Sequence, residues 1–235
     1  MIRTRIDGDV RVVTLDRPEA RNALRPADLT ALREAFAEPE AEEGPPVTFL
    51  RGAGDAFCAG ADLDAVAALD DPAAFARRGQ RVAAAIEESP SVVVCGIDGA
   101  ARGGGVELAL AADVRVATPR ATLAEPGVSL GLFGAWGGTV RLPRVMGEGD
   151  AFDFALSGRV LDADAALRTG LVSRVVDDPR SVADEIAAGE ADALAAIKRR
   201  MRDRRESGTQ EAAEATTFAD LHDAHADEIA RLRGE

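Results

Sequence analysis

Three glycine-rich segments of this 235-residue chain carry the residue types that could do chemistry. In the middle one, residues 98–113 (DGAARGGGVELALAAD), three consecutive glycines lead directly into a predicted helix. The unpaired N–H groups and the positive dipole of such a helix start favour an anion or a developing oxyanion. Glu107 lies in the first turn, where a carboxylate is either a proton-transfer group or a dipole partner of the helix. Because the glycines are contiguous, the segment does not match the G-x-G-x-x-G dinucleotide fingerprint.

The other two segments lie on either side of it in the sequence. Residues 51–63 (RGAGDAFCAGADL) contain small residues that let a backbone approach a ligand with an N–H exposed, or that form an ordinary tight loop. Residues 124–144 (AEPGVSLGLFGAWGGTVRLPR) place large apolar side chains among glycines, where they line an apolar slot or pack in the core. These side chains are Leu130, Leu132, Phe133 and Trp136.

The elements that must position these segments alternate between strand and helix. Apolar spacing and the Gly and Pro breaks indicate an α/β core over residues 1–180 and a helical C-terminal region over 181–235. After the strand predicted at 114–117, the chain is predicted to form a loop through Gly134. The predicted strands are 3–6 and 10–15, as a hairpin around Asp7-Gly8-Asp9, then 47–51, 92–97, 114–117 and a short one within 172–176; the predicted helices are 26–37, 72–87, 106–112 and one from about 138.

Composition places the chain among globular proteins. Hydrophobic residues make up 46% of it, enough for a buried core, and no apolar run approaches the ~20 residues that span a bilayer. The N-terminus lacks the apolar stretch of a signal peptide. Cys58 and Cys95 are too few for a disulfide framework, and no zinc-type Cys/His spacing occurs. We therefore expect a cytoplasmic protein with reduced thiols, no metal and no membrane partner.

The charge balance argues against nucleic acid as a partner. The chain has 28 Lys and Arg against 41 Asp and Glu, a formal net charge of -13, which repels phosphates over most of the surface. Lys198 is the only lysine, so nearly every cation is a guanidinium that can bind carboxylate or phosphate through two hydrogen bonds. A GC-rich genome and a salt-loving source both fit this composition.

Taken together and in this order, the segments resemble the enoyl-CoA hydratase/isomerase family, the crotonase superfamily. The resemblance runs from Val10 to about Val176. The motifs that carry it are TLDRPEARNAL (14–24), AFCAGADL (56–63), GGGVELALAADVRVA (103–117), PGVSLGL (126–132), GGTVRLPRVMG (137–147) and SGRVLDADAALRTGLVSRVV (157–176).

The resemblance implies a fold, a substrate and an assembly. The fold is a crotonase-like spiral of ββα units with a helical C-terminal trimerisation region, in a homotrimer or hexamer. The substrate is an acyl-CoA, and no cofactor is needed beyond the coenzyme A that the substrate carries. Two backbone N–H groups, on Ala61 and Gly104, would stabilise a thioester enolate as an oxyanion hole. The implied CoA and substrate contacts are Arg21, Ala23, Leu24, Ala61, Asp62, Leu63, Asp64, Gly104, Leu132 and Trp136, with Arg17 and Arg25 as further cations.

The catalytic carboxylates depart from the family pattern. Hydratases resembling this chain use two glutamates, of which Glu107 matches the first and Gly127 occupies the position of the second. We expect hydration or double-bond isomerisation of an enoyl-CoA with Glu107 as the acid/base group. The alternatives are a catalytically weak CoA-binding protein, or an acyl-CoA hydrolase or decarboxylase. If the stretch is extended, Glu125 faces the same side as position 127 and is an auxiliary carboxylate.

Overall fold

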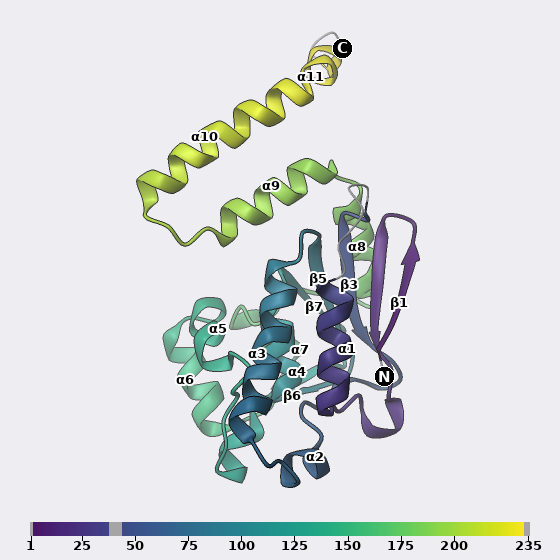
Figure 1. Ribbon diagram of the computed structural model, residues 1–235, viewed down its shortest axis with the longest axis vertical. Coiled ribbons are helices and arrows are strands. Elements are labelled where there is room, and N and C mark those ends of the chain that lie inside the picture. The colour runs from purple at the N-terminus through teal and green to yellow at the C-terminus, as the bar shows by residue number, and fades with distance from the viewer. Residues whose placement is uncertain (1, 38–43, 233–235) are drawn as a thin grey trace. The chain divides into compact units, whose positions relative to one another are not determined.

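The computed structural model describes residues 2–37 and 44–232 (Figure 1). The chain divides into two compact units, residues 1–187 and 188–235, which are treated separately below. The elements of the first unit are β1 (Ile2–Asp7), β2 (Val10–Leu15), η1 (Pro18–Ala20), α1 (Pro26–Ala37), β3 (Val47–Gly52), β4 (Ala56–Cys58), α2 (Leu63–Ala67), α3 (Pro72–Glu88), β5 (Val92–Ile97), β6 (Ala100–Arg102), α4 (Gly104–Ala111), β7 (Val114–Ala117), β8 (Thr122–Ala124), η2 (Pro126–Leu130), α5 (Gly138–Val145), α6 (Glu148–Ser157), β9 (Leu161–Asp162), α7 (Ala163–Arg168), β10 (Arg174–Val175) and α8 (Pro179–Ala187).

The larger sheet has six strands in the order β1-β2-β3-β5-β7-β10. Strands β1 and β2 form the predicted hairpin, antiparallel with Asp7 opposite Val10, and every other pairing is parallel. Helices α1 and α3 lie side by side over the sheet in Figure 1, and α8 contacts β2, β3 and β5. The β5 strand is buried along its whole length, as expected for a parallel strand covered on both faces.

A second, smaller sheet supports the site. It has the order β4-β6-β8-β9, in which β4, β6 and β8 run parallel to one another. The carboxyl ends of parallel strands meet at one edge of a sheet, and ligands commonly bind there. The residues that follow these three strands therefore come together: 59–61 after β4, Gly103 after β6 and Glu125 after β8.

The structure corrects two parts of the predicted element map. The stretch before Gly134, predicted as a loop, contains the strand β8 and the 3₁₀ helix η2. The helix predicted to begin at Val106 begins at Gly104, with Gly103 as its N-cap at a φ of 47°. The strands of the smaller sheet have only two or three residues each, too few for an alternating pattern to be read.

The second unit is helical, as predicted. It consists of α9 (Ala191–Arg202), α10 (Ser207–Ala224) and α11 (Ala226–Leu232). Large apolar side chains on these helices are exposed, namely Ile197, Met201, Phe218 and Ile229. Within the ranges 2–37 and 44–232, no helix combines the length and the apolar character needed to cross a bilayer.

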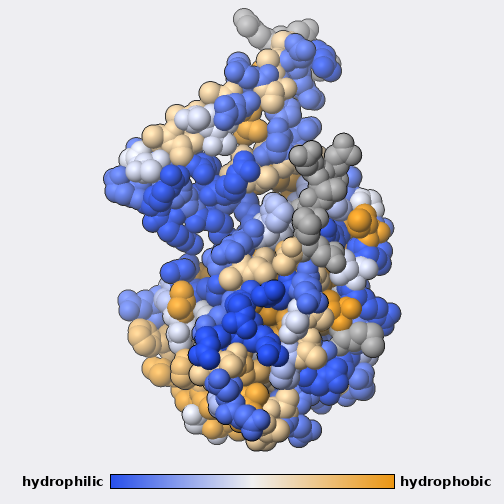
Figure 2. Space-filling view, viewed as in Figure 1, coloured by the Kyte–Doolittle hydropathy of each residue, from blue (hydrophilic) through white to orange (hydrophobic). Residues whose placement is uncertain are grey.

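Apolar side chains also lie on the surface of the first unit. Figure 2 shows them gathered over α5 and α6. Val140 of α5 and Phe152 and Leu156 of α6 are among the exposed residues of these helices. Their exposure in a single chain leaves apolar surface that a neighbouring subunit could cover.

Candidate active site

A cavity of about 280 Å³ lies in the first unit, at the edge where β4, β6 and β8 end. Its walls come from the segment after β4, from α2 and α3, from the start of α4 and from residues 125–136. Glu107 and Glu125 are the only ionisable side chains among the described residues that line it. The others that line it are Ala59, Gly60, Ala61, Leu63, Val66, Leu69, Pro72, Phe75, Ala76, Gly103, Gly104, Pro126, Gly127, Leu130, Leu132, Phe133, Gly134, Ala135 and Trp136.

Backbone pairing orients the amide of Ala61. Leu24 forms an isolated parallel bridge with Ala61: the Leu24 N–H donates to the Gly60 carbonyl at 2.8 Å, and the Asp62 N–H donates to the Leu24 carbonyl at 3.0 Å. In a parallel bridge of this kind the N–H of the middle residue, here Ala61, points away from Leu24.

The start of α4 lies directly beside this segment. A Cβ atom added to Gly60, whose φ is +88°, would come within 3.0 Å of the Gly104 nitrogen. The Gly104 N–H belongs to the first turn of α4, where amides have no partner within the helix. The amides of Ala61 and Gly104 therefore come from adjacent stretches of backbone on one wall of the cavity.

The Trp136 indole forms another wall. A Cβ atom on Gly104 would come within 2.2 Å of the ring, and a Cβ atom on Gly79 of α3 would do the same. Phe75 meets the indole edge-on, with ring centroids 5.7 Å apart. Trp136 is buried and also lines the cavity, so both sequence interpretations of this side chain apply together. Glycine at 79 and 104 is what makes room for the ring.

Glu107 is held by the loop that precedes α5. The Trp136 N–H donates to Glu107 Oε1 at 2.6 Å and the Gly138 N–H at 2.7 Å. Burial raises the pKa of Glu107 from its ordinary value to about 7, although these two hydrogen bonds and the charge of Arg141 oppose the shift. Because the side chain bonds to another loop and faces the cavity, it is more than a dipole partner of its own helix.

Glu125 also lies in the cavity, but not for the expected reason. The stretch after it is not extended, since residues 126–130 form the 3₁₀ helix η2 and Glu125 is its N-cap residue. The carboxyl group is buried, and one of its oxygens, Oε1, has no hydrogen-bond partner among the described residues. Burial, and secondarily the charge of Glu107, raises the pKa of Glu125 to about 8.

The residues expected to bind the substrate divide into two groups. Ala61, Leu63, Gly104, Leu132 and Trp136 line the cavity, together with Gly127, which the sequence resemblance assigns to the second glutamate position. The remaining expected contacts do not line it; they are Arg21, Ala23, Leu24, Asp62 and Asp64.

Two of these outlying residues have structural roles. The side chain of Leu24 is buried in the core, so only its backbone could meet a ligand. Asp62 caps α2 by accepting from the Ala65 N–H at 3.1 Å, and it also accepts from Arg17 at 2.6 Å.

The three arginines of the 17–25 segment are not equivalent. Arg17 is bound to Asp62, and the Arg25 guanidinium contacts Asp28 at 2.8 Å. Arg21 is exposed, and its guanidinium has no carboxylate partner in the described part of the chain. Arg21 is therefore the cation of this segment that is available to an anionic ligand.

Sequence reasoning missed the part played by Asn22. This residue is buried at a φ of 58°. Its side-chain NH₂ donates to the carbonyls of Ala53 at 2.9 Å and Ala56 at 2.8 Å, and its Oδ1 accepts from the Arg17 N–H at 2.9 Å. Asparagine tolerates the left-handed region better than most residues, which was the signal available in the sequence. The Asn22 hydrogen bonds therefore hold the segment before Leu24 against β4, the strand that leads to Ala61.

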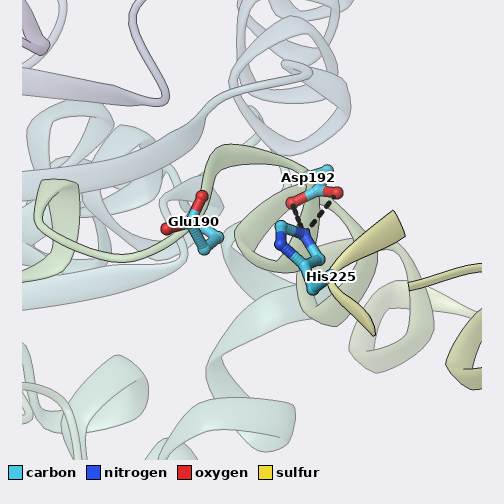
Figure 3. A group of neighbouring side chains, drawn as sticks. All are labelled: Glu190, Asp192 and His225. Atoms are coloured by element: carbon cyan, nitrogen blue, oxygen red, sulfur yellow. Dashed lines mark hydrogen bonds and ion pairs between the residues drawn. The ribbon is translucent and has the colours of Figure 1, made fainter. Parts of the chain in front are cut away.

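A separate cluster in the second unit offers metal-type donors. Glu190, Asp192 and His225 place donor atoms within 4.8 Å of one another (Figure 3). His225 Nε2 lies 2.9 Å from Asp192 Oδ2, and this contact raises the pKa of His225 above its ordinary value. Hydrogen bonding between His225 and Asp192 therefore explains why these two side chains lie together.

Comparison with known proteins identifies the family. The family profile described as enoyl-CoA hydratase/isomerase matches residues 5–230. The chain is 36% identical over 186 residues to the short-chain-enoyl-CoA hydratase of Clostridium acetobutylicum, an alignment that covers 77% of this chain and 71% of the relative. It is also 36% identical over 178 residues to the crotonyl-CoA hydratase of Syntrophomonas wolfei, which covers 74% of this chain and 68% of the relative.

A solved structure agrees. The enoyl-CoA hydratase from Thermoplasma volcanium superposes with a TM-score of 0.89 at 32% identity, over 96% of each chain. The chain therefore belongs to the enoyl-CoA hydratase/isomerase family, and the predicted crotonase-type α/β fold is confirmed.

Proposed function

We propose that this enzyme hydrates an enoyl-CoA or moves its double bond, through a thioester enolate. The observation that carries the proposal is the buried Glu107 carboxyl group in an apolar cavity bordered by the backbone at Ala61 and Gly104. The named activities of the hydratase relatives support the same substrate class.

The two backbone N–H groups and the Glu107 carboxyl group would have different chemical roles. The Ala61 and Gly104 N–H groups would donate hydrogen bonds to the thioester oxygen and stabilise the negative charge that develops on it, an effect worth about 3 to 4 kcal/mol for one such donor in other enzymes. Glu107, with a pKa of about 7, can take and return a proton at neutral pH. The apolar wall at Phe75, Leu132 and Trp136 suits a hydrocarbon acyl group. No cofactor is required beyond the coenzyme A of the substrate.

Gly127 supports a second candidate function. Without a carboxylate at that position, the same cavity could bind acyl-CoA with little turnover, or serve hydrolysis or decarboxylation through the two amides. These reactions share the enolate or oxyanion stabilisation but differ in their products. A product assay on a panel of acyl-CoA thioesters separates them.

The first test is ligand binding. We expect CoA or a short acyl-CoA to raise the Tm of the protein in a thermal-shift assay, because a ligand that binds only the folded state stabilises it. The exposed cation Arg21 predicts that Arg21→Ala weakens this shift, whereas Arg33→Ala, an exposed change on α1, leaves it intact. NAD and ATP serve as control ligands. Equal shifts with acyl-CoA and NAD would contradict the proposal.

We also propose a cytoplasmic homotrimer or hexamer. The exposed apolar side chains of Ile197, Met201 and Phe218 would then be covered by another subunit. We expect multi-angle light scattering to give three or six times the 24.5 kDa chain mass, at physiological and at molar salt. A monomer under both conditions would rule this assembly out.

A further inference from the structure

Backbone atoms crowd the position of the missing glutamate. A Cβ atom on Gly127 would lie 3.1 Å from the Leu132 carbonyl oxygen and 3.2 Å from the Phe133 Cα. Both of these are backbone atoms, and the Leu132 N–H already donates to the Gly127 carbonyl at 2.9 Å. The loop could therefore accommodate a side chain at 127 only by moving its own backbone.

A second carboxyl group nevertheless reaches the cavity, from Glu125. A Cβ atom on Gly134 would lie 3.0 Å from Glu107 Oε1 and 3.2 Å from Glu125 Oε2. The two carboxyl groups thus face the same small volume, which stays open because residue 134 has no side chain. Glu125 lines the large cavity and also a neighbouring one of about 40 Å³.

The two carboxyl groups differ in their surroundings. Glu107 accepts two backbone hydrogen bonds and lies within the field of Arg141, whose guanidinium also pairs with Glu87. Glu125 Oε1 has no partner in the described residues, and the charged group that acts on Glu125 is Glu107 itself. Two buried carboxyl groups so close cannot both be ionised at low cost, so the first proton to leave comes from Glu107, whose ionised form accepts two hydrogen bonds. When the pair holds one proton, that proton therefore resides mainly on Glu125.

We propose that Glu125 is a second catalytic carboxyl group, which gives a proton to a substrate carbon while Glu107 takes one. The inference rests on the proposed function, which supplies the enoyl-CoA. It places the second carboxyl group of the reaction two residues before the position that the family pattern predicts.

The steps balance for both candidate reactions. In hydration, Glu107 takes a proton from water as the water oxygen bonds to C3, and the C2=C3 electron pair moves through C2 to the thioester oxygen. The enolate then re-forms its carbonyl as C2 takes the proton of Glu125. In isomerisation, Glu107 takes a proton from C2 and Glu125 gives one to C4. In each case the pair ends with its one proton on Glu107, and its return to Glu125 across the space at Gly134 restores the enzyme.

The decisive experiment compares two variants, each with a matched control, by steady-state kinetics on crotonyl-CoA and on a 3-enoyl-CoA. We expect Glu125→Gln to lower kcat about 10²-fold while acyl-CoA binding, measured by calorimetry, stays within about threefold. Gly134→Ala, which puts a methyl group between the two carboxyl groups, should lower kcat although both remain. Glu88→Gln, at the exposed end of α3, and Gly149→Ala, in open space on α6, are the matched controls with wild-type activity.

A pH profile separates a catalytic from a merely structural Glu125. A proton donor must be protonated, so kcat/KM of the wild type should fall as pH rises through the pKa of Glu125. Glu125→Gln should lose this alkaline limb. If the wild type is active and Glu125→Gln keeps both its kcat and its alkaline limb, the inference about Glu125 is wrong but the proposed function still stands. A folded, CoA-binding wild type that turns over neither enoyl-CoA would overturn the proposed function, and the role of Glu125 with it.

Discussion

Replacing Glu107 with glutamine should lower the turnover of an enoyl-CoA by about 10² to 10⁴-fold while the protein still binds CoA. Glutamine has nearly the same shape, and its Oε1 can still accept from the N–H groups of Trp136 and Gly138, so the loop before α5 keeps its place. What the substitution removes is the group that exchanges a proton. Steady-state kinetics gives the loss in kcat, and calorimetry with CoA gives the retained affinity.

We also expect Glu107→Gln to change how the free energy of unfolding depends on pH. The pKa of Glu107 is raised by folding to about 7, so between the ordinary pKa of a glutamate and 7 the folded state keeps a proton that the unfolded state has lost. The free energy of unfolding of the wild type therefore falls as pH rises through this window. The glutamine variant lacks this fall, and its Tm should equal or exceed that of the wild type at pH 8. If Glu107→Gln kept a near wild-type kcat, the only role of Glu107 would be to hold residues 136–138 in place.

Asn22→Ala should strongly destabilise the fold near the site. It leaves the part-buried carbonyl of Ala53 and the buried carbonyl of Ala56 without this donor, and it removes the acceptor of the Arg17 N–H. Each such unpaired group costs about 1 to 3 kcal/mol, and alanine in the left-handed region adds about 1 to 2 kcal/mol. We expect a loss of about 4 kcal/mol, which lowers the Tm by roughly 8 to 16 °C for a chain of this size.

Asn22→Gly separates the two causes. Glycine adopts a positive φ freely, so this variant keeps the backbone conformation and loses only the hydrogen bonds. Its Tm should lie between those of the wild type and Asn22→Ala in thermal unfolding followed by circular dichroism. If Asn22→Ala unfolded within about 2 °C of the wild type, the inferred role of these hydrogen bonds would be wrong.

The sequence was sufficient wherever neighbouring residues determine the structure. The Gly8 turn predicted the β1–β2 hairpin, Pro26 marked the start of α1, and the apolar run of residues 92–97 predicted β5. The glycine triplet before Glu107 predicted a helix start with free N–H groups, and two of its members, Gly103 and Gly104, line the cavity. The motif set predicted the family, which the comparisons confirm. These features depend on turn chemistry, capping and periodicity over a few residues.

The tertiary structure alone decided how the segments meet. Strands of two or three residues have no stability by themselves and form only when β4, β6 and β8 pair across 20 or more residues of sequence. That pairing brings residues 59–61, Gly103 and Glu125 to one edge. The 3₁₀ turn after Glu125 and the missing side chain of Gly134 then place a second carboxyl group beside Glu107. The direction of a side chain in an irregular segment depends on what packs around it, which local sequence preferences do not encode.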